Sequence, residues 1–320
     1  MRRTSTFAVA VAACLSVATA DAQEWPARPV QIVVPFAPGG AADILGRLLA
    51  DQLSLHFNQP FVVDNNAGGG GVVGSAIVAN ADPDGYTLVL SGLGSHVISP
   101  TSQLNPGFDP VKSFTHVAYI AGTPIVIVAN PSLGVKSFKD LRAKLKRSKT
   151  ATSYISTGAG TLGNLVAESW ARKEKVKLAH VASRGTITAV AAPAPLGALS
   201  WTTAVAEIRN KTVIPLAVSS AKRMPQFPDV PTLKEFGYPD LVATNWYALS
   251  GPARLPPEIR QKLNSAVAAA LDTPVMRARL DVWGMPGEKM SPGEVTAFVE
   301  SEVGKWGPLV VQAAARGPSR

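Results

Sequence analysis

The segment from Val30 to Ala50 constrains the fold of this 320-residue chain more than any other. Its first part, Val30 to Val34, is mostly apolar and β-branched, which predicts a buried strand. Pro38-Gly39-Gly40 then predicts a tight turn, and leucine and isoleucine recur at helical spacing as far as Leu53. A helix that starts directly after such a turn leaves its first amides free at the positive end of the helix dipole.

That geometry favours the binding of an anion by backbone groups alone. The turn is not followed by the Gly-Lys-Ser/Thr of a nucleotide-binding P-loop. Taken by itself, the segment slightly favours a structural turn packed on a core over a binding site.

Residues 1–22 have the parts of a secretory signal peptide. Arg2 and Arg3 precede a short apolar run from Phe7 to Ala20, and small residues offer cleavage after Ala20 or Ala22. Such a run is short for a membrane span. A second interpretation is a lipid anchor at Cys14, the only cysteine. We therefore expect a periplasmic protein that has no thiol and no disulfide once residues 1–22 are removed.

Without residues 1–22 the chain would carry 29 Lys and Arg against 21 Asp and Glu, a net charge of +8. Much of this charge lies in residues 136–149 and 172–177. Either these cations form a solvated surface, or their field attracts anionic ligands. Nucleic acid is not an expected partner, because the basic clusters lack interleaved aromatic residues and no nucleic-acid motif accompanies them.

Strand and helix patterns alternate along the chain with short loops, which favours an α/β fold with a parallel sheet. A second strand–glycine loop–helix unit, around Ser156–Gly163, echoes the one around Phe36–Gly40. The apolar run from Val117 to Ala129 is long enough for two strands. We predict two α/β lobes, residues 23–124 with 246–320 and residues 125–245, joined by two crossings near 122–126 and 243–248.

Two stretches, Gly69–Gly74 and Gly158–Gly163, match the dinucleotide fingerprint Gly-x-Gly-x-x-Gly. Neither is followed by an acidic residue at the end of the next strand, where the ribose would be held. Arg184 follows the second unit and would suit a 2′-phosphate, so an NADP-dependent enzyme using Gly158–Gly163 stays an alternative.

The four histidines show no metal-ligand spacing, and no catalytic motif is present, so the sequence predicts neither a metal site nor a cofactor. His96 is the exception among them as a candidate binding residue. It follows a predicted strand in a serine-glycine loop, where ligand sites of α/β proteins form.

Several motifs along the chain resemble those of one family. They are Trp25–Gly40 with Asp43, Ala81–Leu88, Asn130–Leu133, Ser219–Arg223, Pro228–Thr232 and Asn245–Tyr247. In this order they resemble the Bug family, the periplasmic solute-binding proteins of tripartite tricarboxylate transporters, and the resemblance runs from about Trp25 to Trp306.

The resemblance implies a two-lobed, type II-like periplasmic binding protein fold that closes on a hinge with two crossovers. It implies no enzymatic activity, a small carboxylate as ligand, and membrane transporter subunits as partners. A sensor protein is an alternative partner, and we expect a monomer. The predicted ligand-binding residues are Phe36, Pro38, Gly39, Gly40, Ala41, Ala42, Ser91, Ser95, His96, Ser156, Thr157, Gly158, Ala159, Gly160, Thr161, Arg184 and Thr202.

The chain departs from the family pattern in the second lobe. Residues 186–203 replace a helix and a strand that usually ends in Phe-Asp, and two prolines in Ala191–Trp201 disfavour a helix there. We therefore expect a remodelled wall in which Trp201, Thr202 and Thr203 line the pocket in place of the usual aspartate.

Overall fold

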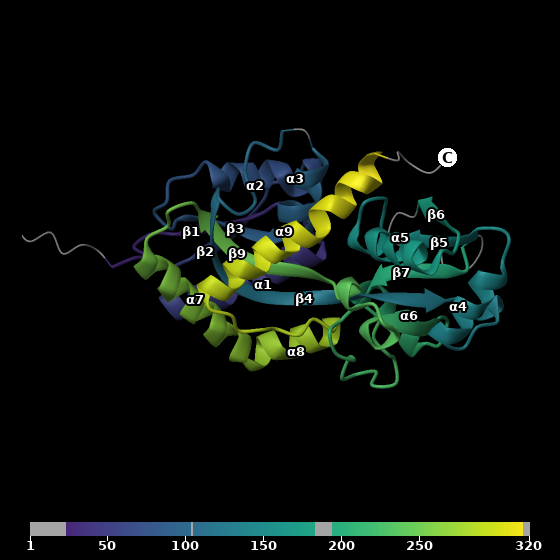
Figure 1. The fold of residues 1–320 in the computed structure, drawn as a ribbon. Coiled ribbons are helices and arrows are strands. Elements are labelled where there is room, and N and C mark those ends of the chain that lie inside the picture. Colours follow the sequence, from purple (N-terminus) through teal and green to yellow (C-terminus); the bar gives the residue numbers. More distant parts are fainter. Residues whose placement is uncertain (1–23, 104, 183–193, 316–320) are drawn as a thin grey trace, which may run out of the picture.

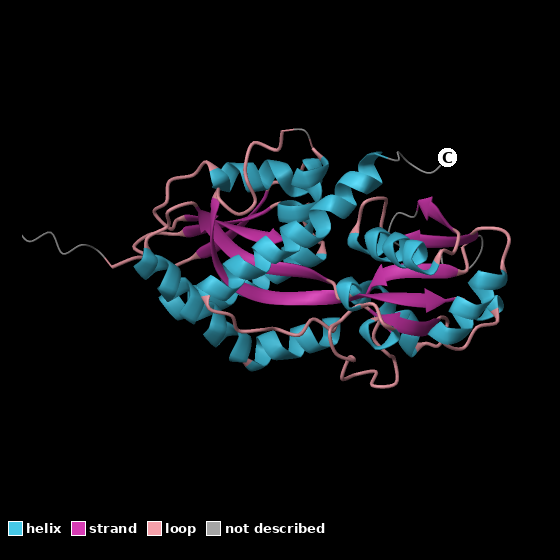
Figure 2. Ribbon diagram, viewed as in Figure 1, coloured by secondary structure: helices cyan, strands magenta, loops and turns pink. Residues whose placement is uncertain are grey.

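The computed structural model describes residues 24–103, 105–182 and 194–315. These residues form two α/β lobes whose strands follow one another in the order β2-β1-β3-β9-β4-β7-β5-β6, with β8 paired to β4 (Figures 1 and 2). The strands are β1 (Val30–Val34), β2 (Phe61–Asn65), β3 (Thr87–Gly92), β4 (Phe114–Ala129), β5 (Thr152–Ser156), β6 (Leu178–Ala182), β7 (Leu196–Ser200), β8 (Ile214–Val218) and β9 (Thr244–Pro252).

The first lobe is built on β1, which pairs in parallel with β2 and β3. The predicted strand Val30–Val34 and the predicted helix after it are confirmed, and their apolar side chains, such as Ile32 and Leu49, are buried in one core cluster. The helices of this lobe are α1 (Ala41–Phe57), η1 (Gly69–Gly71), α2 (Val72–Ala79), η2 (Gly94–Ile98), α3 (Ser99–Ser102), α7 (Pro257–Asp272) and α8 (Pro274–Trp283).

The second lobe repeats this plan around β5, which pairs in parallel with β6 and β7. Its core is closed by Phe138 and Trp170, whose rings lie 5.0 Å apart between two helices. The helices of this lobe are η3 (Pro131–Leu133), α4 (Phe138–Arg147), α5 (Leu162–Glu174), α6 (Trp201–Arg209), η5 (Lys234–Phe236) and η6 (Pro239–Leu241).

The two lobes are joined by β4 and β9, close to the predicted crossings. β4 is one strand of 16 residues, so the apolar run Val117–Ala129, which is long enough for two strands, forms part of a single one. Residues 114–124 of β4 pair with β9, whereas residues 125–129 pair with β7 and β8. All these pairings are antiparallel, which corrects the predicted parallel sheet to a mixed one.

A third connection is the last helix, α9 (Pro292–Ala315), which lies along β4 and reaches α5 (Figure 1). Inside it, Glu302 is buried and accepts hydrogen bonds from the indole N–H groups of Trp246 and Trp306, each at 3.1 Å. Near its end, the Arg172 guanidinium on α5 donates to Gln312 at 3.3 Å. The capping box Ser291-Pro-Gly-Glu294 predicts the start of this helix, but the sequence contains no sign that the helix crosses between the lobes.

Among the described residues, no helix is both long enough and apolar enough to cross a membrane. The predicted signal peptide, residues 1–22, and the alternative lipid anchor at Cys14 lie outside the described residues.

Candidate ligand-binding site

A cavity of about 870 Å³ lies between the two lobes, and residues of both lobes and of α9 line it. One wall is the turn between β1 and α1, and the facing wall is the turn between β5 and α5. Tyr247 and Asn245 of β9 and the end of α9, with Leu309 and Val310, complete it.

The first turn is shaped by Gly39, whose φ of +83° suits glycine although a side chain would find open space there. Gly40 is the N-cap of α1, and no side chain caps the helix at that position. Instead, Asp43 reaches back, and its Oδ2 accepts a hydrogen bond from the Gly39 N–H at 2.9 Å. Ala41 and Ala42, the first two residues of the helix, line the cavity together with Gly40.

The second turn is built in the same way. Gly160 has a φ of +75° and Thr161 is the N-cap of α5. The Oδ1 of Asn164 accepts a hydrogen bond from the Gly160 N–H at 2.9 Å. Leu162 and Gly163, the first two residues of the helix, line the cavity together with Thr161.

The two turns therefore present the same three positions of a helix, the N-cap and the two residues after it, to the cavity from opposite lobes. Amides at these positions have no partner inside their helix, and both helix dipoles present their positive ends. Two such ends facing one cavity are suited to holding an anion by backbone groups.

The charges beside the first turn are balanced. Asp43 is buried, and Arg47 lies 2.9 Å from its Oδ1. The hydrogen bond from Arg47, followed by that from the Gly39 amide, lowers the pKa of Asp43 to about 2. Asp43 is thus ionised at neutral pH, and Arg47 offsets a negative charge that would otherwise repel an anion at this turn.

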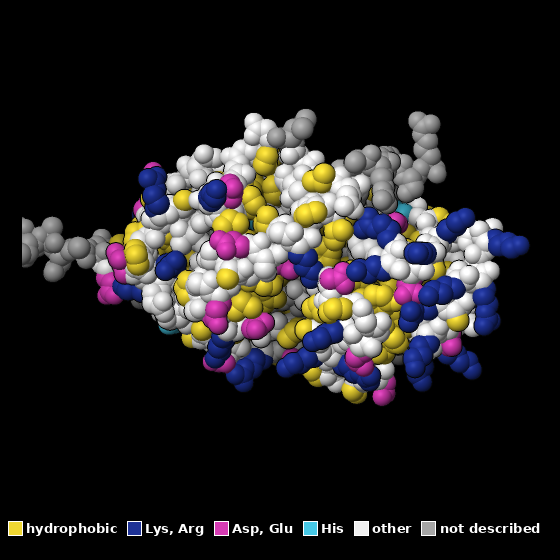
Figure 3. Space-filling model, in the orientation of Figure 1, with side chains coloured by type: hydrophobic (Ala, Val, Ile, Leu, Met, Phe, Trp, Pro, Cys, Tyr) yellow, Lys and Arg dark blue, Asp and Glu magenta, His cyan; other side chains and the backbone are white. Residues whose placement is uncertain are grey.

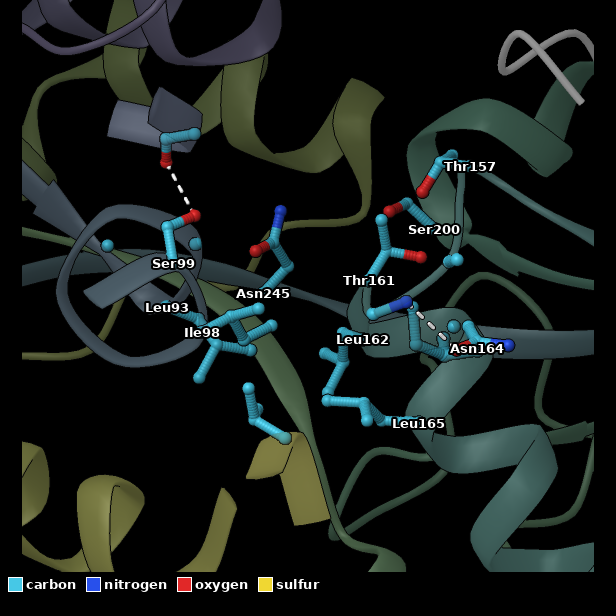
Figure 4. Close-up of a pocket in the computed structure, with 18 of the residues that line it drawn as sticks. Leu93, Ile98, Ser99, Thr157, Thr161, Leu162, Asn164, Leu165, Ser200 and Asn245 are labelled. Atoms are coloured by element: carbon cyan, nitrogen blue, oxygen red, sulfur yellow. Dashed lines mark hydrogen bonds between the residues drawn. The ribbon is translucent and has the colours of Figure 1, made fainter. Parts of the chain in front are cut away.

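The cavity has a polar side and an apolar side (Figure 4). Ser99, Asn245, Ser200 and Thr157 lie along the polar side. On the other side the aliphatic side chains face one another across the gap between the lobes, and they are Leu93, Ile98, Leu162 and Leu165. The arrangement suits a ligand that has a polar or anionic group and a short carbon body.

Eight of the predicted site residues line this cavity: Phe36, Gly40, Ala41, Ala42, Thr157, Ala159, Gly160 and Thr161. Another eight do not line it: Pro38, Gly39, Ser91, Ser95, His96, Ser156, Gly158 and Thr202. The remaining one, Arg184, lies outside the described residues, as does much of the predicted remodelled segment 186–203.

The serine-glycine loop turns its polar side chains inward. Residues Gly94–Ile98 form the helical turn η2, and within it the side chains of Ser95 and His96 are fully buried. The His96 ring packs 4.5 Å from Phe114, and burial holds its pKa well below the usual value. The Ser91 hydroxyl is hydrogen-bonded to the Ser250 hydroxyl, with the two oxygens 2.8 Å apart. Leu93, Ile98 and Ser99, rather than the predicted residues of this loop, line the cavity.

In the second lobe, the buried Ser156 shapes the turn from behind. Its Oγ lies 2.9 Å from His180 Nε2 and 3.2 Å from the Gly158 amide that donates to it. Beyond β7, Trp201 is buried against Phe227, with ring centroids 5.0 Å apart, so Trp201 belongs to the core. Among the described residues 194–203, Ser200 is the one that lines the cavity.

The first glycine fingerprint has a packing explanation. A Cβ on Gly70 would stand 2.2 Å from Ser99 Oγ, and one on Gly71 would stand 2.5 Å from Ser95 Cβ. These glycines let η1 approach both η2 and α3 closely. In the described part of the chain, no group of three or more His, Cys, Asp or Glu side chains is placed to hold a metal ion.

Comparisons with known proteins agree with this architecture. The family described as the tripartite tricarboxylate transporter family receptor matches residues 45–314. Protein BugT of Bordetella pertussis is 30% identical over 310 residues, which is 93% of both chains.

Two solved structures of similar proteins were determined with a ligand. Rpa4515 of R. palustris with adipate is 31% identical, covers 91% of this chain and 99% of its own, and superposes with a TM-score of 0.77. MatC from Rhodopseudomonas palustris with bound malate is 29% identical, covers 89% of this chain and 100% of its own, and superposes with a TM-score of 0.73. Periplasmic binding protein BugD is also 29% identical, with shares of 90% and 98% and a TM-score of 0.73. The chain described here belongs to the receptor family of tripartite tricarboxylate transporters.

Proposed function

We propose that this protein binds a small carboxylate between its lobes in the periplasm and delivers it to a tripartite tricarboxylate-type transporter in the membrane. The observation that carries the proposal is the pair of uncapped helix starts, Gly40–Ala42 and Thr161–Gly163, on facing walls of one cavity. A carboxylate bound between them accepts hydrogen bonds from both lobes only while the cavity is closed, so the ligand favours closure.

The lining indicates what kind of carboxylate fits. The aliphatic side and the polar side suit a linear or branched acid whose second polar group reaches Ser99, Ser200 or Asn245. The relatives solved with adipate and with malate support a small dicarboxylate as the ligand.

The protein acts as a binding protein and not as an enzyme in this proposal. An NADP-dependent enzyme would need Gly158–Gly163 to hold a pyrophosphate. A Cβ on Gly163 would stand 2.1 Å from Ala198 O, but a close helix–strand contact at this glycine is compatible with either role. The match to the receptor family is what favours the binding protein. The export step, cleavage after Ala20 or Ala22, belongs to the same proposal and is tested by the intact mass of exported protein.

Thermal unfolding with a panel of carboxylates tests the function. A ligand that binds only the folded protein raises the melting temperature as its concentration rises above Kd. We expect at least one dicarboxylate or short aliphatic acid to stabilise the protein and NADPH to leave it unchanged. Stabilisation by NADPH at micromolar concentration, with no response to any acid, would contradict the proposal. If the partner is a sensor protein instead of a transporter, the shifts in melting temperature stay the same. The two cases differ in which membrane protein the ligand-bound protein captures.

A further inference from the structure

The charge of the molecule is divided unequally between the lobes. Residues 125–245 contain 17 Lys and Arg against seven Asp and Glu, a formal charge of +10. Residues 23–124 and 246–320 together contain 12 Lys and Arg against 14 Asp and Glu, a formal charge of −2. The second lobe therefore carries the whole positive excess of the protein.

The excess gathers at the end of the second lobe that holds α4 and α5, where Figure 3 shows a concentration of basic side chains. Arg142 and Lys146 of α4 both contact Glu174 of α5, each at 2.9 Å, and this pairing brings the two helices together. Around them, six cations are exposed and take part in no ion pair among the described residues. These six, the lobe-2 basic patch, are Lys139, Lys144, Arg147, Lys149, Lys175 and Lys177.

The patch has no apolar centre. In the described chain, the large hydrophobic side chains that are exposed all lie outside residues 125–245, for example Leu55, Val62 and Val282. A protein–protein interface usually buries aromatic and aliphatic side chains at its centre. A surface of phospholipid headgroups needs only long, flexible cations that are free to reach it.

We propose that the lobe-2 basic patch docks on an anionic phospholipid surface, holding the protein beside the membrane without inserting into it. The contact is electrostatic, so it is reversible and is screened by salt within a Debye length of about 8–10 Å. The six patch residues do not line the cavity, so docking leaves the ligand site free.

Co-sedimentation with vesicles tests the proposal. Vesicles of equal parts phosphatidylglycerol and phosphatidylcholine should bind the full-length protein at low salt, and vesicles of phosphatidylcholine alone should not. The triple variant Lys144→Gln, Arg147→Gln, Lys149→Gln should bind the anionic vesicles about a hundredfold more weakly, because each cation near such a surface raises the affinity about fivefold.

The matched control neutralises three exposed, unpaired cations of the first lobe: Lys112→Gln, Arg254→Gln, Arg279→Gln. It should bind like the wild-type protein, and all variants should keep the wild-type melting temperature. All variants share the same N-terminal segment, so any vesicle binding by that segment cannot cause a difference in binding between the two triple variants. Failure of the folded wild-type protein to bind anionic vesicles would overturn the proposal, as would equal binding by the two triple variants.

Discussion

Asp43 and Asn164 occupy the same position in opposite lobes, each accepting the N–H of the glycine four residues earlier at 2.9 Å. Each side chain fixes the turn in front of its helix without capping the first amides of that helix, although the Thr161 N–H also donates to Gly158 O at 3.3 Å. One turn uses a carboxylate and the other a carboxamide, so what the two turns share is an accepting side-chain oxygen and not a charge.

The first prediction compares two changes at Asp43. Asp43→Ala removes the acceptor of the Gly39 N–H and of the Asn65 side chain, and it should lower the free energy of unfolding by about 1–3 kcal/mol. Asp43→Asn keeps an oxygen for Gly39, as Asn164 does for Gly160, and should cost less. Urea unfolding at pH 7 measures both, and equal losses would show that the ion pair with Arg47 dominates.

The same residue has a pH signature. Its pKa in the folded protein, about 2, is below the unfolded value of 3.8. Its stabilising contribution is therefore present above about pH 4 and is lost as the pH falls towards 2. The difference between wild type and Asp43→Asn should shrink over that interval.

The buried histidines predict a second pH effect at milder acidity. His96 and His116 have ring centroids 6.4 Å apart, and each Nε2 has no hydrogen-bond partner in the described structure. Burial lowers both pKa values from 6.5, that of His116 to about 4. Their stabilising contribution is present above pH 6.5 and is lost as the pH falls from 6.5 towards 4, because the unfolded chain then binds more protons.

Replacing His96 with phenylalanine should make the free energy of unfolding fall less steeply as the pH is lowered. The control His56→Gln changes an exposed histidine and should leave this slope unchanged. Unfolding free energies measured between pH 7 and pH 4.5 report the slope. A slope for His96→Phe as steep as that of the wild type would mean that other groups cause the acid loss.

The link between α9 and β9 predicts a third effect. Glu302→Ala leaves the indole N–H groups of Trp246 and Trp306 unpaired, at a cost of about 1–3 kcal/mol each. Glu302→Gln keeps an oxygen that accepts both and should cost much less. Burial raises the pKa of Glu302, so the loss of charge in the glutamine variant is tolerated. Equal destabilisation in the two variants would show that Glu302 stabilises the fold through its charge, by attraction to Lys305, and not through the two indole hydrogen bonds.

Local patterns predicted the parts of the site that are made locally. The strand, turn and helix around Gly39 and the matching unit around Gly160 can be recognised because glycine and apolar periodicity act over a few residues. The orientation of His96 could not be predicted, because η2 buries a side chain that an open loop would expose. Leu309 and Val310 enter the cavity wall through the return of α9, a contact between distant segments that no local pattern encodes.

The length of β4 was left open for a related reason. An apolar run of this length can hold one strand or two, and its single course is set by pairing with β9 in one lobe and with β7 and β8 in the other. Asn245 and Tyr247 lay in a segment noticed for its resemblance to the Bug family, yet their place in the cavity depends on that same pairing.

The central claim, that backbone amides of the two turns hold the carboxylate, is tested most directly at Ala41. Ala41→Pro deletes one N–H at the first helical position, where proline is tolerated and no helical hydrogen bond is lost. Gly40 already has φ −80° and ψ 170°, the extended backbone that a following proline requires. Ala41→Ser keeps the N–H and is the control.

Isothermal titration with a carboxylate that stabilises the wild-type protein gives the answer. The account predicts that Ala41→Pro weakens binding by about 1.5–3 kcal/mol, the range for a hydrogen bond to a charged group, while its melting temperature without ligand stays at the wild-type value. Ala41→Ser should bind almost as tightly as the wild-type protein. Equal affinities for the proline and serine variants would contradict the account and would make this turn a structural element only.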